Sequence, residues 1–525
     1  MPKPISTAIS SFRKIRENGC VYVDKTAYFH RLATDPDGMF FLARPRRFGK
    51  SLMISTLKAL FEGRRELFAG LAIEKTGWDW EAERRPVMHF DLSRAASSVS
   101  AAEFAARLPG LVRAAIEEAG GAYQSGRDYV ENFGNAIDEL SRANGGRGVV
   151  VLIDEYDDPV ARLLHRTDEA ETVRGMLADF YGQLKARAEN VRFLMITGVS
   201  KFTKMSVFSA LSNLIDLSFR DDCATMLGYT EEELDTFFDE HLRVHAAIMG
   251  MDYADYRAEL KRWYNGYRFG RRERTTVYNP VSIGQNLAMP EPAFQNYWVT
   301  TGKASMLMNF LRREEYLSVN LDDVRGVDEA DFDVTNIREL RTVPMLYQTG
   351  YLTIDTYNPS AQAYDLRVPD EEVRQDLSRL TAAYLADRST EWVVSLGKRL
   401  LLAKWDEFFA GLKALYAGLP YGPREGAVHE FSFERVLMTL LRSQGVRCRA
   451  EDRQSNGQAD VVGEHPCGVY LFELKVDESA ESALDQIRRK GYAAPYRADG
   501  RPVWLVGLGF DRATRQLTDA KAERH

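Results

Sequence analysis

The stretch Phe40–Ser51, with the sequence FFLARPRRFGKS, decides the fold of the first half of this chain. Its first four residues are apolar, as in a buried strand, and an arginine-rich loop follows. After Gly49-Lys50-Ser51, apolar residues recur at helical spacing through Leu52–Phe61. The pattern therefore predicts a strand, a short loop and a helix, with Gly-Lys-Ser where the helix begins.

A loop of this kind is suited to binding the phosphates of ATP. Backbone N–H groups of Phe48, Gly49 and Lys50 at a helix N-terminus can surround a phosphate, and the helix dipole adds to the attraction. The Lys50 side chain would reach the β- and γ-phosphates, and the Ser51 hydroxyl would bind Mg²⁺. The usual pattern is G-x-x-x-x-G-K-S/T, and Arg44 stands where that pattern has its first glycine. Taken alone, the pattern is also compatible with a helix start that carries a surface lysine.

Three arginines, Arg44, Arg46 and Arg47, flank the expected phosphate position. A guanidinium group suits phosphate because it can donate two parallel hydrogen bonds. The alternative is that the arginines stabilise the loop by packing and ion pairs where a glycine is missing. The sequence leaves both interpretations open.

Two further strands end in polar residues. Val149–Ile153 is apolar at every position, which is typical of a strand buried on both faces, and Asp154-Glu155 follows it. Asp154 could hold the Mg²⁺ water shell and Glu155 could polarise the attacking water. The strand Phe193–Thr197 ends in Thr197, which would lie beside the γ-phosphate. Each feature alone could be an ordinary strand end, but in this order the three predict an ATP site with Mg²⁺.

The alternation of strands and helices over the first 220 residues predicts a mostly parallel sheet covered on both faces. Besides these two strands, its expected strands are Met39–Ala43, which leads into the arginine-rich loop, Val87–Leu92 and Leu214–Phe219. We expect an ATPase core over residues 1–225, a helical subdomain over 226–300, and a helical connector with a β-hairpin over 301–420. The subdomain contains a helix that begins at Thr230, and the hairpin pairs Tyr351–Tyr357 with Tyr364–Val368.

The last expected segment, residues 421–525, carries a second group of chemically active side chains. Its pattern predicts a helix near 433–443, strands near 447–451, 458–462, 469–476 and 503–507, and a helix over 480–492. Glu473 and Lys475 are two apart in a strand and so project to one face, and Asp460 opens a strand that can pair with it. Two carboxylates and an ammonium would then meet, and carboxylates are ligands that Mg²⁺ prefers. Alternating charge on an exposed strand is the simpler explanation of the spacing alone.

Other motifs accompany these two sites along the chain: Tyr22–Thr26 (YVDKT), Val207–Leu214 (VFSALSNL), Tyr264–Phe269 (YNGYRF), Leu346–Leu352 (LYQTGYL) and Pro369–Arg374 (PDEEVR). Together with Arg44–Leu52 and Leu152–Asp157 they resemble a bacterial AAA-ATPase-like family that carries a C-terminal PD-(D/E)xK nuclease domain. The resemblance spans nearly the whole chain. It implies an α/β architecture: a P-loop parallel-sheet domain, a helical middle region and a restriction-endonuclease-like domain.

The resemblance also implies further site residues. Gln486, on the helix after the E-x-K strand, would join Asp460, Glu473 and Lys475 as a catalytic residue. Glu430 would be an additional metal ligand, with Glu434 one turn later as an alternative. Both glutamates could instead only offset the dipole of the helix on which they lie.

Charge, cysteine content and hydropathy indicate which classes of partner and which compartment to expect. The chain has 525 residues and a net charge of −7, which argues against a surface covered in basic charge, although Lys and Arg balance Asp and Glu after residue 420. The four scattered cysteines and the lack of a signal-peptide or membrane pattern predict a cytoplasmic protein without a membrane partner.

The leading hypothesis is an ATP-controlled, Mg²⁺-dependent phosphodiesterase acting on nucleic acid, with DNA favoured over RNA and with oligomer formation left open. One alternative is an ATP-dependent switch whose nuclease fold binds nucleic acid or another partner without cutting. The other is an ATPase scaffold with a structural C-terminal domain.

Overall fold

The computed structural model describes residues 2–7, 10–96, 100–201, 214–297, 324–332, 341–418, 431–454, 457–496 and 500–525. Contacts divide these residues into two compact units. One consists of the described parts of Met1–Tyr297 and Glu314–Asp370, and the other includes Glu371–His525. The residues expected to form a helical connector therefore fall into both units. Within the described ranges, no helix has both the length and the apolar composition that crossing a bilayer requires.

The first unit is built on a five-stranded parallel sheet in the order β2-β3-β4-β1-β5. Its strands are β1 (Met39–Ala43), β2 (Val87–Asp91), β3 (Val149–Asp154), β4 (Val191–Gly198) and β5 (Ile215–Asp216). The predicted strands are confirmed, except that Leu214–Phe219 contributes only the two residues of β5. Burial of β1 and β3 at every position explains their continuous apolar sequences.

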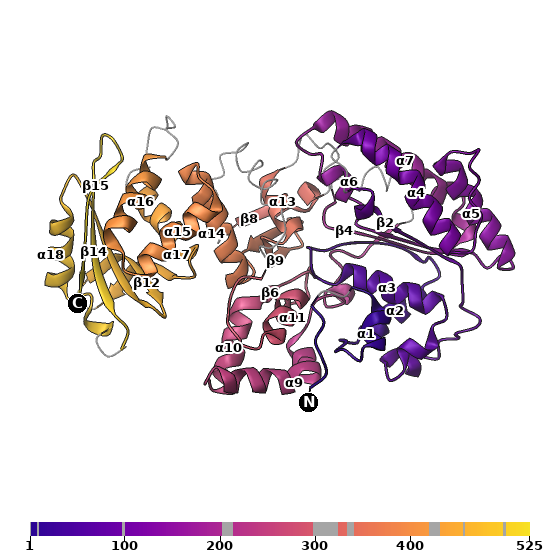
Figure 1. The fold of residues 1–525 in the computed structure, drawn as a ribbon, viewed down its shortest axis with the longest axis horizontal. Helices are drawn as coiled ribbons and strands as arrows, with labels where there is room; N and C mark the ends of the chain where they lie inside the picture. Colours follow the sequence, from indigo (N-terminus) through magenta and orange to yellow (C-terminus); the bar gives the residue numbers. More distant parts are fainter. Residues whose placement is uncertain are drawn as a thin grey trace. The chain divides into compact units, whose positions relative to one another are not determined.

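Helices cover both faces of this sheet, as the alternating pattern predicted (Figure 1). One face carries α1 (Phe12–Glu17), α2 (Thr26–Ala33) and α3 (Lys50–Phe61). The other carries α4 (Ala101–Glu118), α5 (Tyr129–Ala143), α6 (Asp158–Ala161) and α7 (Thr167–Ala186). Because β4 lies between β1 and β3, the end of β4 separates the Gly-Lys-Ser loop from the acidic end of β3.

Smaller elements complete the first unit: α9 (Glu231–Ile248), α10 (Tyr253–Tyr264), β6 (Asn265–Tyr267), β7 (Val277–Tyr278), α11 (Pro280–Ala288), β8 (Val324–Asp328), α13 (Thr342–Thr349), β9 (Thr353–Asn358) and β10 (Ala363–Arg367). The prediction that a helix begins at Thr230 is confirmed, because Thr230 and Glu233 cap α9 reciprocally. The predicted hairpin is confirmed as β9 paired antiparallel with β10.

The second unit has a five-stranded sheet in the order β11-β12-β13-β14-β15. Its elements are α14 (Glu371–Ala386), α15 (Thr390–Leu401), α16 (Trp405–Ala417), α17 (Phe431–Arg442), β11 (Arg447–Gln454), β12 (Gly457–His465), β13 (Gly468–Val476), α18 (Ala480–Lys490), β14 (Val503–Phe510) and β15 (Leu517–Arg524). One apolar core joins α14–α17 to one face of the sheet, and a second joins α18 to the other face (Figure 1).

The second unit differs from the sequence prediction in two details. The helix expected to reach Tyr492 ends at Lys490, because Gly491 adopts the left-handed conformation with φ 68° and closes α18. The strand β15 was not predicted. Its sequence LTDAKAER lacks apolar alternation because the strand pairs only with β14, at the edge of the sheet, and remains largely solvent-accessible.

Candidate functional sites

The loop between β1 and α3 leads into the helix through a glycine in a backbone conformation that other residues rarely adopt. Gly49 lies just before α3 in the left-handed conformation, with φ 94°, and no atom would lie within 4 Å of a Cβ placed on it. The space beside the backbone is therefore open at the helix N-terminus, where N–H groups attract anions. Ser51, the second residue of α3, is half-buried at the same end of the helix.

Lys50 is bound to its own loop. Its ammonium donates hydrogen bonds to the backbone oxygens of Arg44, at 3.0 Å, and Pro45, at 3.1 Å, and the residue is only 3% exposed. Both acceptors are neutral carbonyls. Phosphate oxygens carry charge and accept stronger hydrogen bonds than these carbonyls do. In this arrangement the lysine is positioned above the loop in which a phosphate would lie.

The ends of β3 and β4 are joined by polar contacts. Thr197 Oγ1 donates a hydrogen bond to Asp154 Oδ1 at 2.6 Å, and the same oxygen accepts the Glu155 N–H at 3.0 Å. Glu155 adopts the left-handed conformation with φ 52°, which is uncommon for a residue with a side chain and clusters at functional sites. Burial raises the pKa of the Glu155 carboxyl, while the nearby Lys50 ammonium lowers it. Asp154, Glu155, Thr197 and Lys50 therefore belong to one polar site.

Asp157 has a part in this site that the sequence did not indicate. Its carboxylate accepts hydrogen bonds from the backbone N–H groups of Val199, at 3.1 Å, and Ser200, at 2.8 Å. Gly198 lies under the same turn, where a Cβ would come within 2.4 Å of the Tyr156 ring. The Asp154–Asp157 segment thus holds the chain that leaves β4. The only signal in the sequence was that two more acidic residues, Asp157-Asp158, follow soon after Asp154-Glu155.

The structure places the three arginines in different environments. The Arg44 guanidinium is buried, where it donates to the backbone oxygens of Ser218, at 2.7 Å, and Cys223, at 3.3 Å, and lies 4.3 Å above the Phe269 ring. These contacts match the packing alternative. Arg46 makes an ion pair with buried Asp158 at 2.8 Å, and Arg47 donates to the backbone oxygen of Tyr297.

The YNGYRF motif supports the loop through its aromatic rings. Phe48 is buried against Tyr267, with 4.7 Å between ring centroids, and against Phe269, at 5.2 Å. The Tyr267 hydroxyl donates to the backbone oxygen of Gly350 at 3.0 Å. The side chain of Phe48 therefore packs inward, and only its backbone remains suited to phosphate. The motif was visible in the sequence, but nothing in it indicated this contact.

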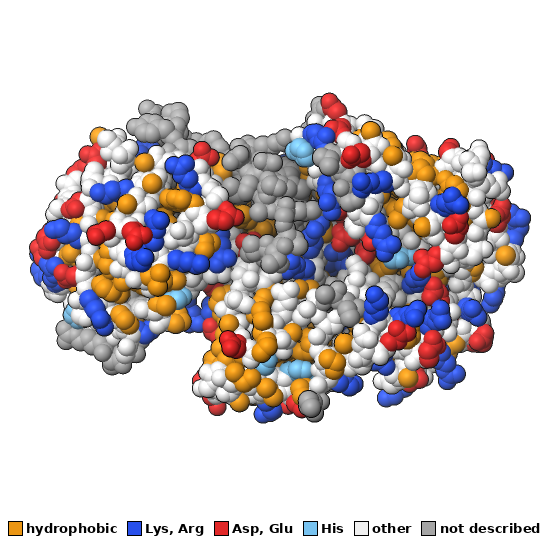
Figure 2. All heavy atoms as spheres, viewed as in Figure 1, with side chains coloured by type: hydrophobic (Ala, Val, Ile, Leu, Met, Phe, Trp, Pro, Cys, Tyr) orange, Lys and Arg blue, Asp and Glu red, His pale blue; other side chains and the backbone are white. Residues whose placement is uncertain are grey.

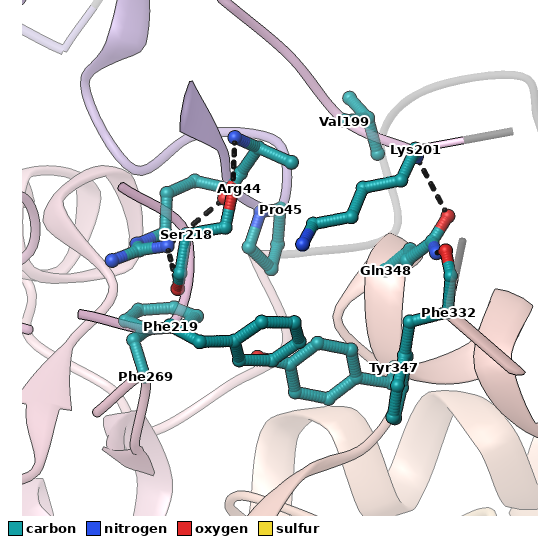
Figure 3. A pocket seen from close by; sticks show the side chains of 11 residues that line it. Arg44, Pro45, Val199, Lys201, Ser218, Phe219, Phe269, Phe332, Tyr347 and Gln348 are labelled. Carbon is teal, nitrogen blue, oxygen red and sulfur yellow. Dashed lines mark hydrogen bonds between the residues drawn. The ribbon is translucent and has the colours of Figure 1, made fainter. Parts of the chain in front are cut away.

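A small pocket lies beside the start of the loop (Figure 3). Its lining includes Arg44, Lys201, Phe219, Tyr347 and Gln348. The Lys201 ammonium makes an ion pair with Asp216 at 2.8 Å and lies 4.2 Å above the Phe219 ring, while its backbone N–H donates to Gln348 at 3.0 Å. These contacts tie the chain after β4 to β5 and to α13. The pocket therefore lies where these three segments pack together, next to the loop.

The second unit brings its predicted residues together on β12, β13 and α18. The antiparallel register that pairs Val461 with Phe472 sets Asp460 beside Glu473. Asp460 accepts the Leu474 N–H at 2.7 Å, and Lys475 Nζ lies 3.3 Å from Glu473 Oε1. Gln486 on α18 donates to the same Glu473 oxygen.

Glu473 is the centre of this arrangement and is 1% exposed. Its Oε2 atom is buried and has no hydrogen-bond partner among the residues that the structure describes. Burial, with Asp460 as the second cause, raises the pKa of Glu473 to about 7. A buried carboxylate oxygen with no donor carries a large desolvation cost, which a cation would relieve.

The carboxylates of Asp460 and Glu473 fit Mg²⁺, which is commonly bound by one or two carboxylates and keeps several waters. No cluster of three or more His, Cys, Asp or Glu side chains occurs among the residues that the structure describes, so Glu434 does not extend the pair. Glu430 lies outside the described residues.

Glycine at Gly507 permits the approach of α18. Gly507 pairs with Glu473 across β14 and β13, and a Cβ on it would lie 2.1 Å from the Ala480 backbone oxygen. The start of α18 therefore rests directly on the β14 backbone. This close packing lets Gln486, less than two turns along the helix, reach Glu473.

Comparisons with known proteins match both the N-terminal and the C-terminal part of the chain. A family model described as a predicted AAA-ATPase matches residues 6–208, and a PD-(D/E)XK nuclease superfamily model matches residues 428–520. A protein of Azotobacter chroococcum mcd 1, "Uncharacterized protein in vnfD 5'region", is 34% identical over 528 residues, covering 98% of each chain.

Among solved structures, the Aeropyrum pernix ORC2 protein (ADPNP-ADP complexes) matches 66% of this chain and 87% of its own, with 13% identity and a TM-score of 0.26. The family assignment does not depend on that likeness. It rests on the two family models and on a relative that matches from end to end. The chain belongs to the family of AAA-ATPase-like proteins that carry a PD-(D/E)XK nuclease superfamily domain at the C-terminus.

Proposed function

We propose that the first unit binds ATP with Mg²⁺ and hydrolyses it. The N–H groups of residues 48–50 receive the β- and γ-phosphates, and Lys50 exchanges its two carbonyl acceptors for phosphate oxygens. Ser51 and Asp154 hold Mg²⁺, which neutralises charge on the phosphates when bound. Support comes from the meeting of Lys50, Asp154 and Thr197 at one edge of the sheet.

Glu155 orients the water that attacks the γ-phosphate. The raised pKa of its carboxyl makes it a better proton acceptor than an ordinary glutamate, and Lys50 favours its ionised form. Thr197 keeps Asp154 in place through its hydrogen bond. Arg46 and Arg47 stay candidates for phosphate contact. Arg44 contributes its backbone oxygen and its packing.

The second unit, in our proposal, cleaves phosphodiester bonds of nucleic acid with Mg²⁺. The observation that carries this is the buried Glu473 Oε2 beside Asp460, to which no described residue donates a hydrogen bond, with Lys475 and Gln486 on the other oxygen of Glu473. Asp460 and Glu473 would hold the cation, which when bound would supply an acidified water and stabilise negative charge on the phosphate. Lys475 orients the attacking water, and Gln486 fixes the Glu473 carboxylate.

DNA is the favoured substrate over RNA, and the nucleotide state of the first unit controls cleavage. The control is motivated by the presence of both sites in one chain. A chain that binds nucleic acid without cutting is the competing function. It predicts that binding survives while no Mg²⁺-dependent product forms on any substrate.

One cleavage experiment tests the proposal. Single- and double-stranded DNA and RNA are incubated with Mg²⁺ or Mn²⁺, with and without ATP, and with wild type, Lys475→Ala, Asp460→Ala and Lys50→Ala. Lys521→Ala is the control, because Lys521 has an exposed ion pair with Glu481 at 3.0 Å in the same unit. We expect the first two variants to abolish cleavage and Lys50→Ala to abolish only its response to ATP. Cleavage that survives both Asp460→Ala and Lys475→Ala would refute the assigned site. An ATP response that survives Lys50→Ala would refute the proposal that nucleotide bound to the first unit regulates cleavage.

A further inference from the structure

The two flanks of α18 differ in whether their basic side chains form ion pairs. Three consecutive basic residues end the helix: Arg488, Arg489 and Lys490. Arg488 is neutralised by three carboxylates, with Glu523 Oε1 at 2.8 Å, Glu481 Oε1 at 2.9 Å and Asp485 Oδ1 at 2.7 Å. Arg489 and Lys490 are exposed and make no ion pair or hydrogen bond with any residue that the structure describes.

Helical geometry places the unpaired charges on the side of the candidate site. Residues three and four apart are neighbours on a helix, so Arg489 and Lys490 follow Gln486 by one turn. Gln486 contacts Glu473 on β13, whereas Arg488 reaches Glu523 on β15, across β14. The flank with Gln486 therefore faces the carboxylates, and the flank with Arg488 faces away from them.

At this flank the two basic side chains have no carboxylate partner among the described residues. Figure 2 shows basic and acidic side chains interspersed over the visible face. Most basic residues that contact other described residues through their charged groups, like Arg488, form ion pairs with carboxylates. Two adjacent cations with no partner keep their full charge for a ligand. A polyanion that enters the site needs such cations, because Asp460 and Glu473 repel it until a metal ion is bound.

We infer that Arg489 and Lys490 bind the phosphodiester backbone of a nucleic acid one turn of helix away from the reacting phosphate. This rests on the proposed nuclease function and adds the surface along which the strand lies. Both residues are positioning residues, since neither touches Glu473, Asp460 or Lys475. Contacts to phosphate are independent of base sequence and depend strongly on salt concentration.

The test compares the double variant Arg489→Gln/Lys490→Gln with Arg488→Gln in the full chain. Fluorescence anisotropy measures binding of labelled single- and double-stranded DNA and RNA in EDTA across a salt series. Each lost phosphate contact lowers the slope of log K against log salt by about 0.9 on duplex DNA and about 0.7 on single strands. We expect the double variant to lose both contacts and to bind about tenfold more weakly at moderate salt, with Arg488→Gln close to wild type. The strand type on which the slope falls by the full two contacts, about 1.8 on duplex DNA or about 1.4 on single strands, is the one that the two residues bind.

A separate arm with Mg²⁺ distinguishes this inference from the proposed function. If the residues position the strand, the double variant raises KM for cleavage and leaves kcat within about twofold of wild type. Equal slopes in the double variant and wild type, or equal losses in the double variant and Arg488→Gln, would overturn the inference, even if wild type cleaves. Absence of binding by wild type would overturn it as well. Absence of cleavage together with the expected slope change would overturn the proposed function alone.

Discussion

Thr197 donates a hydrogen bond to Asp154 across the ends of β4 and β3, with 2.6 Å between Oγ1 and Oδ1. Both residues are buried, and β4 is the strand that separates β3 from the Gly-Lys-Ser strand β1. The hydroxyl therefore fixes a carboxylate whose other contact is the N–H of Glu155. The position of Asp154, which we propose as a Mg²⁺ ligand, depends on a side chain from a neighbouring strand.

Thr197→Val keeps the volume of this side chain and removes its hydroxyl. We expect ATP hydrolysis to fall at least about tenfold, which corresponds to about 1.4 kcal/mol, because Asp154 loses its fixed orientation. ATP affinity should change less than about threefold, since the loop after β1 is untouched. The control is Thr56→Val, which also removes a buried threonine hydroxyl, one that donates to the Leu52 oxygen at 2.8 Å. Steady-state hydrolysis and calorimetric binding report the two effects, and equal losses in both variants would contradict the prediction.

Arg44→Gly would restore the usual glycine of the phosphate-binding pattern, and we expect it to harm the protein. The guanidinium donates to the Ser218 and Cys223 oxygens and lies over Phe269, so its removal leaves buried acceptors and a cavity. A loss of about 3 kcal/mol in the free energy of unfolding follows from these combined effects. Arg46→Ala is the comparison, because Asp158 keeps its 2.6 Å ion pair with Arg162. Urea denaturation measures both variants, and a more stable Arg44→Gly would show that the arginine is not a structural replacement for glycine.

Stability without metal should depend on pH through Glu473. Its folded pKa is raised to about 7, above the usual value for glutamate, so the folded state binds the proton more tightly. The stability that this protonation contributes is fully present below about pH 4.5 and is lost as pH rises to about 7. Glu473→Gln should therefore be more stable than wild type at pH 8 in EDTA, by roughly 1–3 kcal/mol, and similar at pH 4.5. Denaturation at the two pH values tests this, and a constant difference would show that Glu473 does not titrate in this range.

Mg²⁺ binding should show the opposite pH dependence, because the metal requires the ionised carboxylate. Below about pH 7, binding should release up to one proton and weaken by about tenfold per pH unit, and above pH 8 it should level off. Calorimetry in two buffers with different ionisation enthalpies measures the released proton. Asp460→Asn is informative here, since removing the second cause of the raised pKa should shift this dependence to lower pH. Proton release that stays constant from pH 5 to 8 would exclude Glu473 as the titrating ligand.

Gly507→Ala should reduce cleavage by the second site indirectly, by displacing α18. The new Cβ would lie 2.1 Å from the Ala480 oxygen, so α18 must move by about 1 Å to restore a 3.0 Å contact. Gln486 would then lose its hydrogen bond to Glu473. We expect cleavage to fall at least about tenfold with a stability loss of about 2 kcal/mol. Gly182→Ala is the control, because Gly182 lies within α7 with nothing within 4 Å of a Cβ, and it should be neutral or slightly stabilising. Normal cleavage by Gly507→Ala would show that the α18 contact is dispensable.

Much of the architecture followed from patterns that act over short distances along the chain. The apolar run before Asp154 predicted a central strand because burial on both faces excludes polar residues. Glu473 and Lys475 were predicted to share a face because side chains alternate along a strand, and the 3.3 Å contact between them confirms this. The strand β15 was not predicted, because such predictions rely on apolar alternation. An edge strand that is largely solvent-accessible carries no such alternation.

Long-range contacts decided the remaining features. Whether Arg44 faces a phosphate or the interior depends on Ser218 and Phe269, which lie about two hundred residues away and leave no mark near Arg44 in the sequence. The requirement for glycine at Gly507 arises from the backbone of Ala480, and the role of Asp157 arises from the turn after β4. The sequence by itself predicted most of the side chains that meet at the two candidate sites, because strand and helix periods are local. Only the tertiary structure decided how each is held, because burial, unpartnered atoms and raised pKa values arise where distant segments pack together.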